Sequence, residues 1–354
     1  MIATGCGSAI PADESEPVTR HLVYEKATGI WIASPDGNQP RLLLKGGHAP
    51  AISPDGKWVA FFDECSQSTG RCSLFLTPTT EAKSRPLASG FYGEFHWSPS
   101  SDRIVAARTP DDEGGLVEAL VSIEVPSGDE TTLTEGALYG WSFSPDGNET
   151  VFAVAQHRSG EGFSGDEVDL FITGQDGGDA KRITRDGHSG YPVWGPKSIA
   201  FAKLISCLPP TPQDVMEGCS NNTWGRHEIW QVQPDGADRR PIVSPTPKRF
   251  HGQGYIGLVP LDWSADGEEL LAGLLNEWGR IPLAVDLRTG DVRQLAKDQA
   301  SDGVALSDDG VMALLERLDH ARSYPGSSAV LIAPYAGGKA QLVANGAASA
   351  NWNR

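Results

Sequence analysis

One short pattern recurs along the chain and constrains its fold more than any other feature. An apolar residue precedes Ser-Pro-Asp-Gly, or a close variant of it, and an apolar segment follows. The positions equivalent to the serine are 53, 98, 144, 195, 264, 307 and 353. Most of them lie about 40–50 residues apart, which is the length of a four-stranded propeller blade. The longer interval, from 195 to 264, holds the Pro-rich insertion Leu208–Pro212 and is interpreted as an elaborated blade.

The chemistry of the pattern fits a strand that ends in a tight turn. Asp and Gly adopt the positive φ angles that a hairpin turn needs, and Pro fixes φ just before the turn. The Trp, Phe or Leu before the serine position is expected to pack between neighbouring blades. So many Asp-Gly pairs also suggest calcium sites. Turn chemistry accounts for all of the pairs, so the turn interpretation is preferred.

The two ends of the chain complement each other. The segment His21–Leu44 holds three apparent strands and no innermost one, whereas Ala347–Asn353 is a lone innermost strand. Joining them completes a blade and removes the exposed edges of an open array. The sequence therefore predicts an all-β protein. Residues 20–354 are expected to form a single seven-bladed β-propeller with four-stranded antiparallel blades, closed by the C-terminal strand joining the N-terminal blade.

The Ser-Pro-Asp-Gly units, such as Ser53–Gly56 and Ser144–Gly147, resemble the repeats of TolB and of the propeller domain of prolyl oligopeptidases. The resemblance covers nearly the whole chain from about His21. WD40-like repeats are a weaker match, because the sequence has no Trp-Asp dipeptide. The resemblance implies the fold more than a function, since propellers host many activities. TolB has a separate N-terminal α/β domain without a counterpart here, so its role of binding a peptidoglycan-associated lipoprotein is not carried over to this chain.

Four of the five cysteines form two local pairs, Cys65 with Cys72 and Cys207 with Cys219. Each pair brackets a loop, so we expect two disulfides that hold these loops. Zinc is the alternative for four cysteines, but the paired CxxC spacing of zinc sites is missing. Disulfides are typical of oxidising compartments outside the cytoplasm.

The remaining cysteine, Cys6, follows the small residues Ala3-Thr4-Gly5. Small residues before a cysteine resemble the end of a bacterial lipoprotein signal, in which the cysteine is lipidated. The charged and apolar regions of such a signal do not precede it, so either the start lies upstream or the leader has no meaning. We expect an extracytoplasmic protein, in the periplasm or on the outer face of the membrane. It would be lipid-anchored through Cys6, with residues 1–19 as a lipobox-like N-terminus and flexible acidic tether.

The formal net charge of −17 limits the partners. Nucleic acids and anionic membrane surfaces require a basic footprint, so neither is expected. No apolar run reaches the roughly 20 residues that span a bilayer, so membrane contact is expected only through the lipid on Cys6. A cationic ligand would be steered toward the protein. We expect a monomer.

Propeller ligands usually meet the face formed by the loops that enter the innermost strands and the loops that join the second and third strands. These loops are rich in aromatic and histidine residues, and aromatic residues beside polar groups suit peptides and glycans. The predicted binding residues are Tyr92, Glu94, His96, Tyr139, His188, Tyr191, Trp224, His251 and Tyr255. The favoured function is a non-catalytic envelope scaffold that presents a rigid loop face to a protein, peptide or glycan. It needs no catalytic residue, metal or cofactor.

The alternative is a metal-dependent lyase or hydrolase that acts on acidic saccharides. His48, His96, His188 and His251 all precede or begin innermost strands, and imidazoles are good ligands for transition metals. Seven-bladed oligogalacturonate lyases resemble this type of repeat and hold a metal through histidines and a glutamine. Convergence of three or more histidines on one point would favour the enzyme. A peptidase is not expected, because the chain has no Gly-x-Ser-x-Gly nucleophile motif.

Overall fold

The computed structural model describes residues 19–66, 72–109, 118–155, 167–207, 225–243, 257–276, 279–297, 302–307, 310–317 and 328–353. The secondary structure of these residues consists of β-strands and turns, as the sequence predicts. None of them belongs to a helix that is long and apolar enough to cross a membrane.

The described strands form five sheets, three of which have four strands. The first has the order β27 (Ala347–Trp352), β1 (Leu22–Lys26), β2 (Gly29–Ala33), β3 (Arg41–Leu44). The second comprises β11 (Leu138–Phe143), β12 (Glu149–Ala155), β13 (Val168–Gly174) and β14 (Lys181–Arg182). The third comprises β23 (Asp302–Leu306), β24 (Met312–Arg317), β25 (Ala329–Pro334) and β26 (Gln341–Asn345).

The two remaining sheets are larger. One has seven strands: β4 (His48–Ile52), β5 (Trp58–Asp63), β6 (Cys72–Pro78), β7 (Arg85–Trp97), β8 (Arg103–Arg108), β9 (Glu118–Glu124) and β10 (Glu130–Gly136). The other has eight: β15 (Ser189–Trp194), β16 (Ile199–Cys207), β17 (Gly225–Val232), β18 (Arg240–Val243), β19 (Gly257–Trp263), β20 (Glu269–Asn276), β21 (Gly279–Asp286) and β22 (Val292–Gln294).

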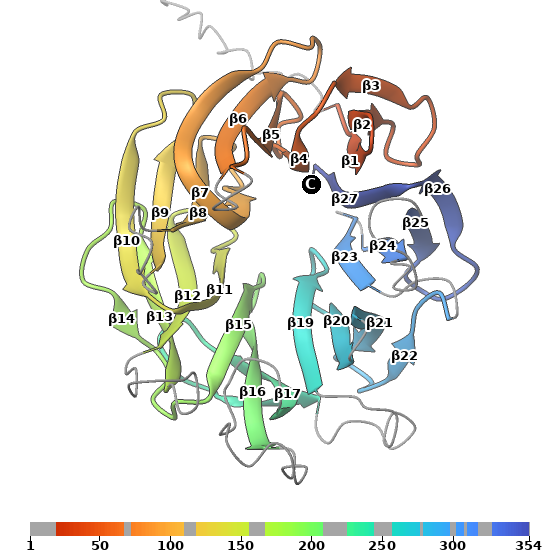
Figure 1. Cartoon of the computed structure of the whole chain (residues 1–354). Helices are drawn as coiled ribbons and strands as arrows, with labels where there is room; N and C mark the ends of the chain where they lie inside the picture. Colours follow the sequence, from red (N-terminus) through yellow and green to blue (C-terminus); the bar gives the residue numbers. More distant parts are fainter. Residues whose placement is uncertain are drawn as a thin grey trace, which may run out of the picture.

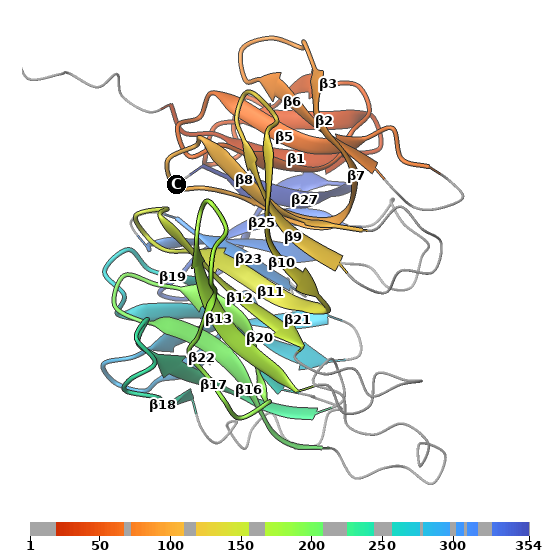
Figure 2. The same ribbon diagram turned by 90° about the vertical axis from the view of Figure 1, so that its left-hand side faces the viewer.

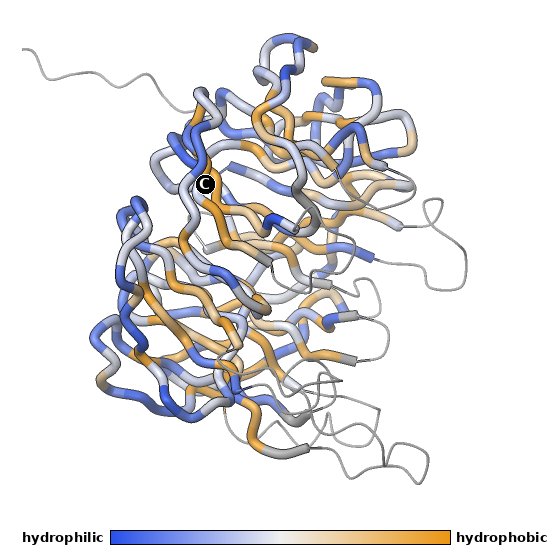
Figure 3. The backbone as a smooth tube through the Cα atoms, turned by 60° about the vertical axis from the view of Figure 1, so that its left-hand side comes forward, coloured by the Kyte–Doolittle hydropathy of each residue, from blue (hydrophilic) through white to orange (hydrophobic). Residues whose placement is uncertain are grey.

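The sheets stand around a common centre, with β4, β7, β11, β15, β19, β23 and β27 nearest to it (Figure 1). Seen from the side, the strands run between the two faces of this ring (Figure 2). Hydrophobic residues follow the strands, whereas hydrophilic residues concentrate in the turns (Figure 3). The core accordingly lies between neighbouring sheets. Tyr24 of β1, for example, belongs to one buried cluster with Leu314 and Val330 of the β23–β26 sheet.

The larger sheets depart from the expectation of separate four-stranded units. β7 is 13 residues long and pairs with β6 through its first part and with β8 through its last part, because no loop interrupts it. In the eight-stranded sheet, β17 and β19 make one parallel pairing, His227 with Gly257. A Cβ at Gly257 would lie 2.6 Å from the backbone nitrogen of His227, so this approach requires glycine.

The predicted pairing of the C-terminal strand with the N-terminal segment is confirmed. β27 is antiparallel to β1, with Leu22 opposite Trp352 and Lys26 opposite Ala347. Asn353, which takes the serine position of the last repeat, accepts the backbone N–H of His21 at 2.6 Å. The last copy of the repeat therefore helps to hold the two ends of the chain together.

The repeated motif forms the expected turns. The hydroxyl of Ser53 donates to Oδ1 of Asp55 at 2.6 Å and accepts the backbone N–H of Trp58 at 3.0 Å. Ser264 and Asp266 make the equivalent hydroxyl–carboxylate bond at 2.7 Å. These carboxylates serve the turns, which agrees with the turn interpretation of the Asp-Gly pairs.

Tryptophans just before the serine position join neighbouring innermost strands, as predicted. The indole N–H of Trp97 donates to the carbonyl of Ala51, and that of Trp263 donates to the carbonyl of Val193, both at 3.0 Å. The second contact also explains why Gly195 replaces serine in its repeat. A Cβ at Gly195 would lie 2.6 Å from carbons of the Trp263 ring.

One predicted disulfide is confirmed. Cys65 and Cys72 are bridged, with 4.0 Å between their Cα atoms, across the connection from β5 to β6. Cys207 ends β16, but its side chain and Cys219 lie outside the described residues, so the second bridge stays a prediction. Cys6 and residues 1–18 of the expected tether also lie outside them.

Restoring the repeat consensus at one site is expected to destabilise the protein. Gly195→Ser places a Cβ and a hydroxyl against the Trp263 ring and should lower the free energy of unfolding by about 1–3 kcal/mol. Gly178→Ser is the matched control, because no atom lies within 4 Å of its added Cβ. Urea denaturation measures both. A Gly195→Ser protein as stable as the parent would contradict this account of the departure from the repeat.

Removal of the observed disulfide is also expected to weaken the fold. A Cys65→Ser/Cys72→Ser variant should lose about 2 kcal/mol of unfolding free energy, because its unfolded chain is less constrained. A reductant should lower the unfolding free energy of the parent, because it breaks this bridge. Any further decrease that the reductant causes in the variant measures the contribution of other bridges. Mass spectrometry of the unreduced, alkylated protein gives the direct check. Alkylation of both Cys65 and Cys72 would show that the bridge is absent.

Candidate functional site

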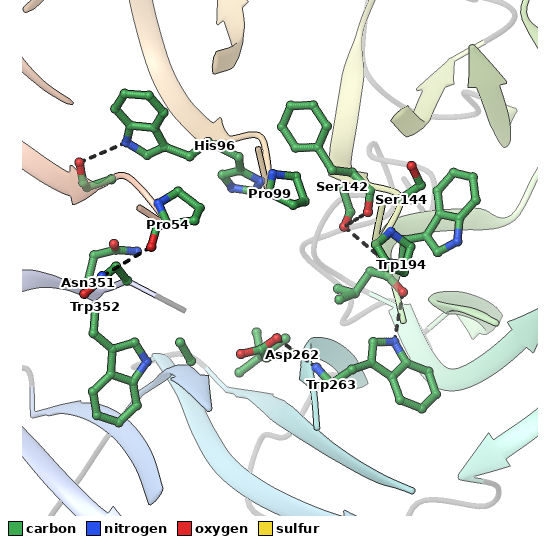
Figure 4. Close-up of a pocket in the computed structure, with 18 of the residues that line it drawn as sticks. Pro54, His96, Pro99, Ser142, Ser144, Trp194, Asp262, Trp263, Asn351 and Trp352 are labelled. Atoms are coloured by element: carbon green, nitrogen blue, oxygen red, sulfur yellow. Dashed lines mark hydrogen bonds between the residues drawn. The ribbon is translucent and has the colours of Figure 1, made fainter. Parts of the chain in front are cut away.

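One position of the repeat faces the centre of the ring. It lies two residues before each serine position and is occupied by Ala51, His96, Ser142, Val193, Asp262, Ala305 and Asn351. All seven line a single cavity of about 470 Å³ (Figure 4). The cavity also contacts the Ser-Pro turns that follow the innermost strands, so it lies in the half of the ring where these strands end. Equivalent strands present equivalent pleat positions, which explains why the repeat generates this lining.

Three polar members of the lining tie innermost strands together. Oδ1 of Asn351 accepts the backbone N–H of Ile52 at 3.1 Å. The hydroxyl of Ser142 accepts that of Trp194 at 3.1 Å. Oδ2 of Asp262 accepts the backbone N–H at the end of β23 at 2.7 Å. These side chains therefore fix the spacing of the strands around the cavity, in addition to facing it.

His96 makes a different contact. Its Nε2 lies 2.7 Å from Oε1 of Glu94 on the same strand, and its ring lies 5.5 Å, centre to centre, from that of Trp141 on β11. The side chains of His96 and Glu94 are 39% and 68% exposed. Solvent therefore reaches the pair from the cavity that His96 lines, although protein surrounds the pair closely enough for burial to affect the pKa values of both groups.

The two groups shift each other's protonation. The charge of His96 is the main cause that lowers the pKa of Glu94; burial opposes it, while the hydrogen bond to His96 and the charge of Arg280 assist. Burial is the largest influence on His96 and lowers its pKa. The charge of Glu94 and the hydrogen bond to it together outweigh burial, so the pKa of His96 is raised overall.

The innermost strands β4, β15 and β27 are bulged near their starts, and a residue with left-handed backbone marks each bulge. Ala49, Tyr191 and Ser349 have φ angles of 47°, 52° and 50°. A bulky residue in this region is strained, and such residues gather at functional sites. Tyr191 packs against Gly140 of the neighbouring strand, where a Cβ would lie only 3.2 Å from the Tyr191 Cα.

Arg280 at the start of β21 adds a positive charge to this region. Its charge lowers the pKa of Glu94 and opposes the effect of burial, which raises the pKa of Tyr191. The fold thus brings Arg280 into electrostatic range of Tyr191 in its own eight-stranded sheet and of Glu94 in the seven-stranded sheet.

The other predicted site residues do not gather at one place in the part of the chain that the structure describes. Tyr139 is 4% exposed and packs in a core cluster. His188 is exposed, and its backbone N–H donates to Asp186. His48, considered for the metal site, lies 2.9 Å from Glu25. The Tyr92 side chain and the whole of Trp224, His251 and Tyr255 lie outside the described residues, so their roles stay predictions.

Ser142, Asp262, Asn351 and Arg280 are not among the binding residues that the sequence predicts. The first three share the repeat position of His96, so the spacing to the serine contains the signal that places them. Arg280 follows a short connection between β20 and β21, and no pattern in the sequence distinguishes it. Among the described residues, no three His, Cys, Asp or Glu side chains gather in a way that could hold a metal ion.

No family model matches this sequence, and no curated protein matches it significantly. Solved structures do resemble it. An oligogalacturonate lyase in complex with manganese is 17% identical, with a TM-score of 0.57 over 92% of this chain and 84% of the lyase. TolB from Acinetobacter baumannii is 14% identical, with a TM-score of 0.51 over 95% of this chain and 83% of TolB.

The β-propeller domain of the Trilobed protease from Pyrococcus furiosus is 13% identical, with a TM-score of 0.61 over 89% of this chain and 86% of that domain. At such low identity, these likenesses establish the fold and leave the function open. They agree with the sheets arranged around a centre and with the Ser-Pro-Asp-Gly repeats. In its fold, the chain is a TolB-like β-propeller.

Proposed function

We propose that this chain is a non-catalytic binding scaffold that holds an envelope protein, peptide or glycan at the centre of its ring. The observation that carries the proposal is the cavity of about 470 Å³, to which each of the seven innermost strands contributes at least one residue. Its volume falls within the roughly 300–1,000 Å³ of typical ligand pockets. Loops around the ring, with Tyr92, Trp224, His251 and Tyr255, would extend the contact surface.

The hydrogen bonds around the cavity favour binding over catalysis. Ser142, Asp262 and Asn351 accept backbone N–H groups of other innermost strands, so they act first as rigid spacers. A preformed, rigid wall lowers the entropy cost of binding. The Glu94–His96 pair remains for polar contact with a ligand.

For the ring itself, the proposal is seven four-stranded blades. The seven-stranded sheet divides into two blades within the long strand β7, and the eight-stranded sheet divides between β18 and β19. The pairing of β27 with β1 would then close the ring.

We further propose that the protein works outside the cytoplasm as a monomer. The Cys65–Cys72 bridge supports an oxidising compartment. The lipid anchor on Cys6 belongs to this proposal and supplies its membrane contact. The net charge of −17 disfavours nucleic acid as a partner.

The alternative is a metal-dependent lyase or hydrolase of acidic saccharides, which the likeness in fold to an oligogalacturonate lyase favours. His251 belongs to that hypothesis and lies outside the described residues. Incubation of the protein with manganese and oligogalacturonate tests the lyase alternative. A lyase creates a double bond in its product, and the ultraviolet absorbance of that bond is measured. Metal-dependent product formation that His96→Gln abolishes would replace the scaffold proposal by the enzyme.

Filling the cavity is expected to abolish ligand binding. The parent should select ligands from a peptide display library or a glycan array. Ala305→Phe should weaken their binding at least about tenfold, since the ring occupies the cavity. Ala180→Phe, at an exposed turn, is the matched control and should bind like the parent. Both variants are first compared by thermal unfolding. Ligands that bind the two variants equally would place recognition elsewhere.

The Glu94–His96 pair predicts a specific pH dependence. His96 has a raised pKa, so its contribution to stability is present below its ordinary value of 6.5 and is lost as pH rises through the raised value. Glu94 has a lowered pKa, so its contribution is present above its ordinary 4.5 and is lost as pH falls through the lowered value. The pair therefore stabilises the fold most between these two ordinary values.

Nuclear magnetic resonance of the His96 ring protons checks this dependence. The pKa should exceed 6.5 in the parent and fall in Glu94→Gln, because burial then acts without the carboxylate. Glu64→Gln, an exposed carboxylate, is the control and should leave it unchanged. A His96 pKa that is equal in the parent and in Glu94→Gln would show that the two groups do not interact in solution.

A further inference from the structure

One outer strand of the ring lacks the charges that comparable strands carry. The strands β3, β10, β14, β22 and β26 end their sheets on the outer side of the ring, so each has an edge that no described strand pairs with (Figure 1). The first four contain charged residues, among them Arg41, Glu130, Lys181 and Arg293. β26 reads Gln-Leu-Val-Ala-Asn and contains none. Charges at an edge discourage pairing with another chain, so β26 is the edge among these five that is suited to a further strand.

β26 is held on one face and open on the other. The turn between β2 and β3 covers the first face, where a Cβ at Gly37 would lie 2.8 Å from Cγ1 of Val343. Side chains alternate along a strand, so Leu342 lies on the opposite face. Leu342 is 47% exposed, compared with 37% for Leu42 of β3. The open face therefore presents a large apolar side chain on a strand whose position is fixed.

A pocket of about 500 Å³ borders the open face of β26. Leu342, Gln341 and the preceding Ala340 line it together with Leu331 of β25. Leu331 and Ala340 are buried and belong to the core cluster that also contains Leu271 of β20. The floor of the pocket is therefore apolar. A strand added beside β26 would place alternate side chains on this face, where an aliphatic side chain fits the pocket.

Two positive charges complete the lining of the pocket. They are Arg317 at the end of β24 and Lys339 just before β26. Both are exposed, and neither forms an ion pair within the part of the chain that the structure describes. No Asp or Glu is among the described lining residues. Physiological salt screens charges beyond about 8 Å, so these two cations outweigh the distant acids of the chain at this point and favour a carboxylate.

We propose that β26 is a docking edge for an extended segment of a partner protein, which adds to the sheet as a further strand. An aliphatic residue of that segment occupies the pocket beside Leu342, and acidic residues next to it pair with Arg317 and Lys339. This surface is separate from the central cavity and goes beyond the function proposed for it. A second copy of the chain fits less well, because its own β26 supplies no carboxylate for the two cations.

The test uses the full chain and a library of random ten-residue peptides displayed on phage. Selection is for binding to the parent, with a counter-selection against Leu342→Glu, which removes the apolar contact and adds a carboxylate to the lining. The selected peptides should bind the parent at least about tenfold more tightly than Leu342→Glu and carry Asp or Glu beside an aliphatic residue. Leu42→Glu, the same change on the outer strand β3, is the matched control and should bind them like the parent.

Two further comparisons test the charges and the backbone. Arg317→Glu/Lys339→Glu should weaken binding of the selected peptides at least about tenfold, whereas Lys45→Glu/Lys83→Glu, with the same change in net charge at exposed positions, should alter it at most about twofold. Peptides N-methylated at alternate residues lose the N–H groups of one edge. Of the two alternate patterns, one should weaken binding strongly and the other little, because an added strand pairs through one edge. Thermal unfolding shows beforehand that every variant is folded.

Each comparison has an outcome that contradicts the proposal. Equal binding of all selected peptides to Leu342→Glu and Leu42→Glu rules out the docking edge. Selected peptides without acidic residues, or equal effects of the two double variants, overturn the acidic character of the partner. Equal binding of both N-methylated forms overturns strand addition. A parent dimer in sedimentation that Leu342→Glu dissociates would assign the edge to a second copy. Loss of these peptides in Ala305→Phe would place them in the central cavity instead.

Discussion

The structure depends on hydrogen bonds that cross from one innermost strand to another. A sheet with four strands buries little by itself, so its apolar faces must pack against neighbouring sheets. Side chains such as Ser142 and Asn351 set the distance between innermost strands, because each accepts a backbone N–H of another strand. The indoles of Trp97 and Trp263 make the complementary contact, because their N–H groups donate to backbone carbonyls of other innermost strands. Packing alone tolerates small shifts, whereas these directional contacts fix the position of each strand at the centre.

The candidate site follows from the same contacts. The side chains that tie strands together also line the cavity, so its wall is rigid and its polar groups have defined orientations. His96 occupies the same repeat position but bonds to Glu94 on its own strand. The ring thereby combines a fixed acid, Asp262, with a titratable pair. In the proposed binding function, the fixed groups would select the ligand and the exposed pair would respond to it.

Departures from the repeat have local physical causes. Gly195 replaces serine because the Trp263 ring occupies the space of a side chain. Gly257 permits the contact between β17 and β19 that joins two units into one sheet. Tyr191 keeps left-handed backbone at a bulge where glycine would be unstrained, and it does so beside Gly140 of the neighbouring strand. At these positions, the space that contacts between strands and sheets allow determines the residue, and the repeat pattern does not.

The amino-acid sequence by itself determined the all-β class, the turns, the pairing of the last strand with the first, and the Cys65–Cys72 bridge. Each of these depends on local chemistry or on the count of strands at the chain ends, and both can be read without coordinates. The tertiary structure decided which residues meet at the centre. The pairing of every innermost strand with its neighbour contains a bulge or a shift in register. Counting alternate residues from the start of such a strand therefore assigns the wrong side chains to its inward face. The distance to the serine position does place Asp262, but Arg280 reaches Glu94 only through an approach between two sheets, whose geometry depends on the packing of side chains that are distant in the sequence.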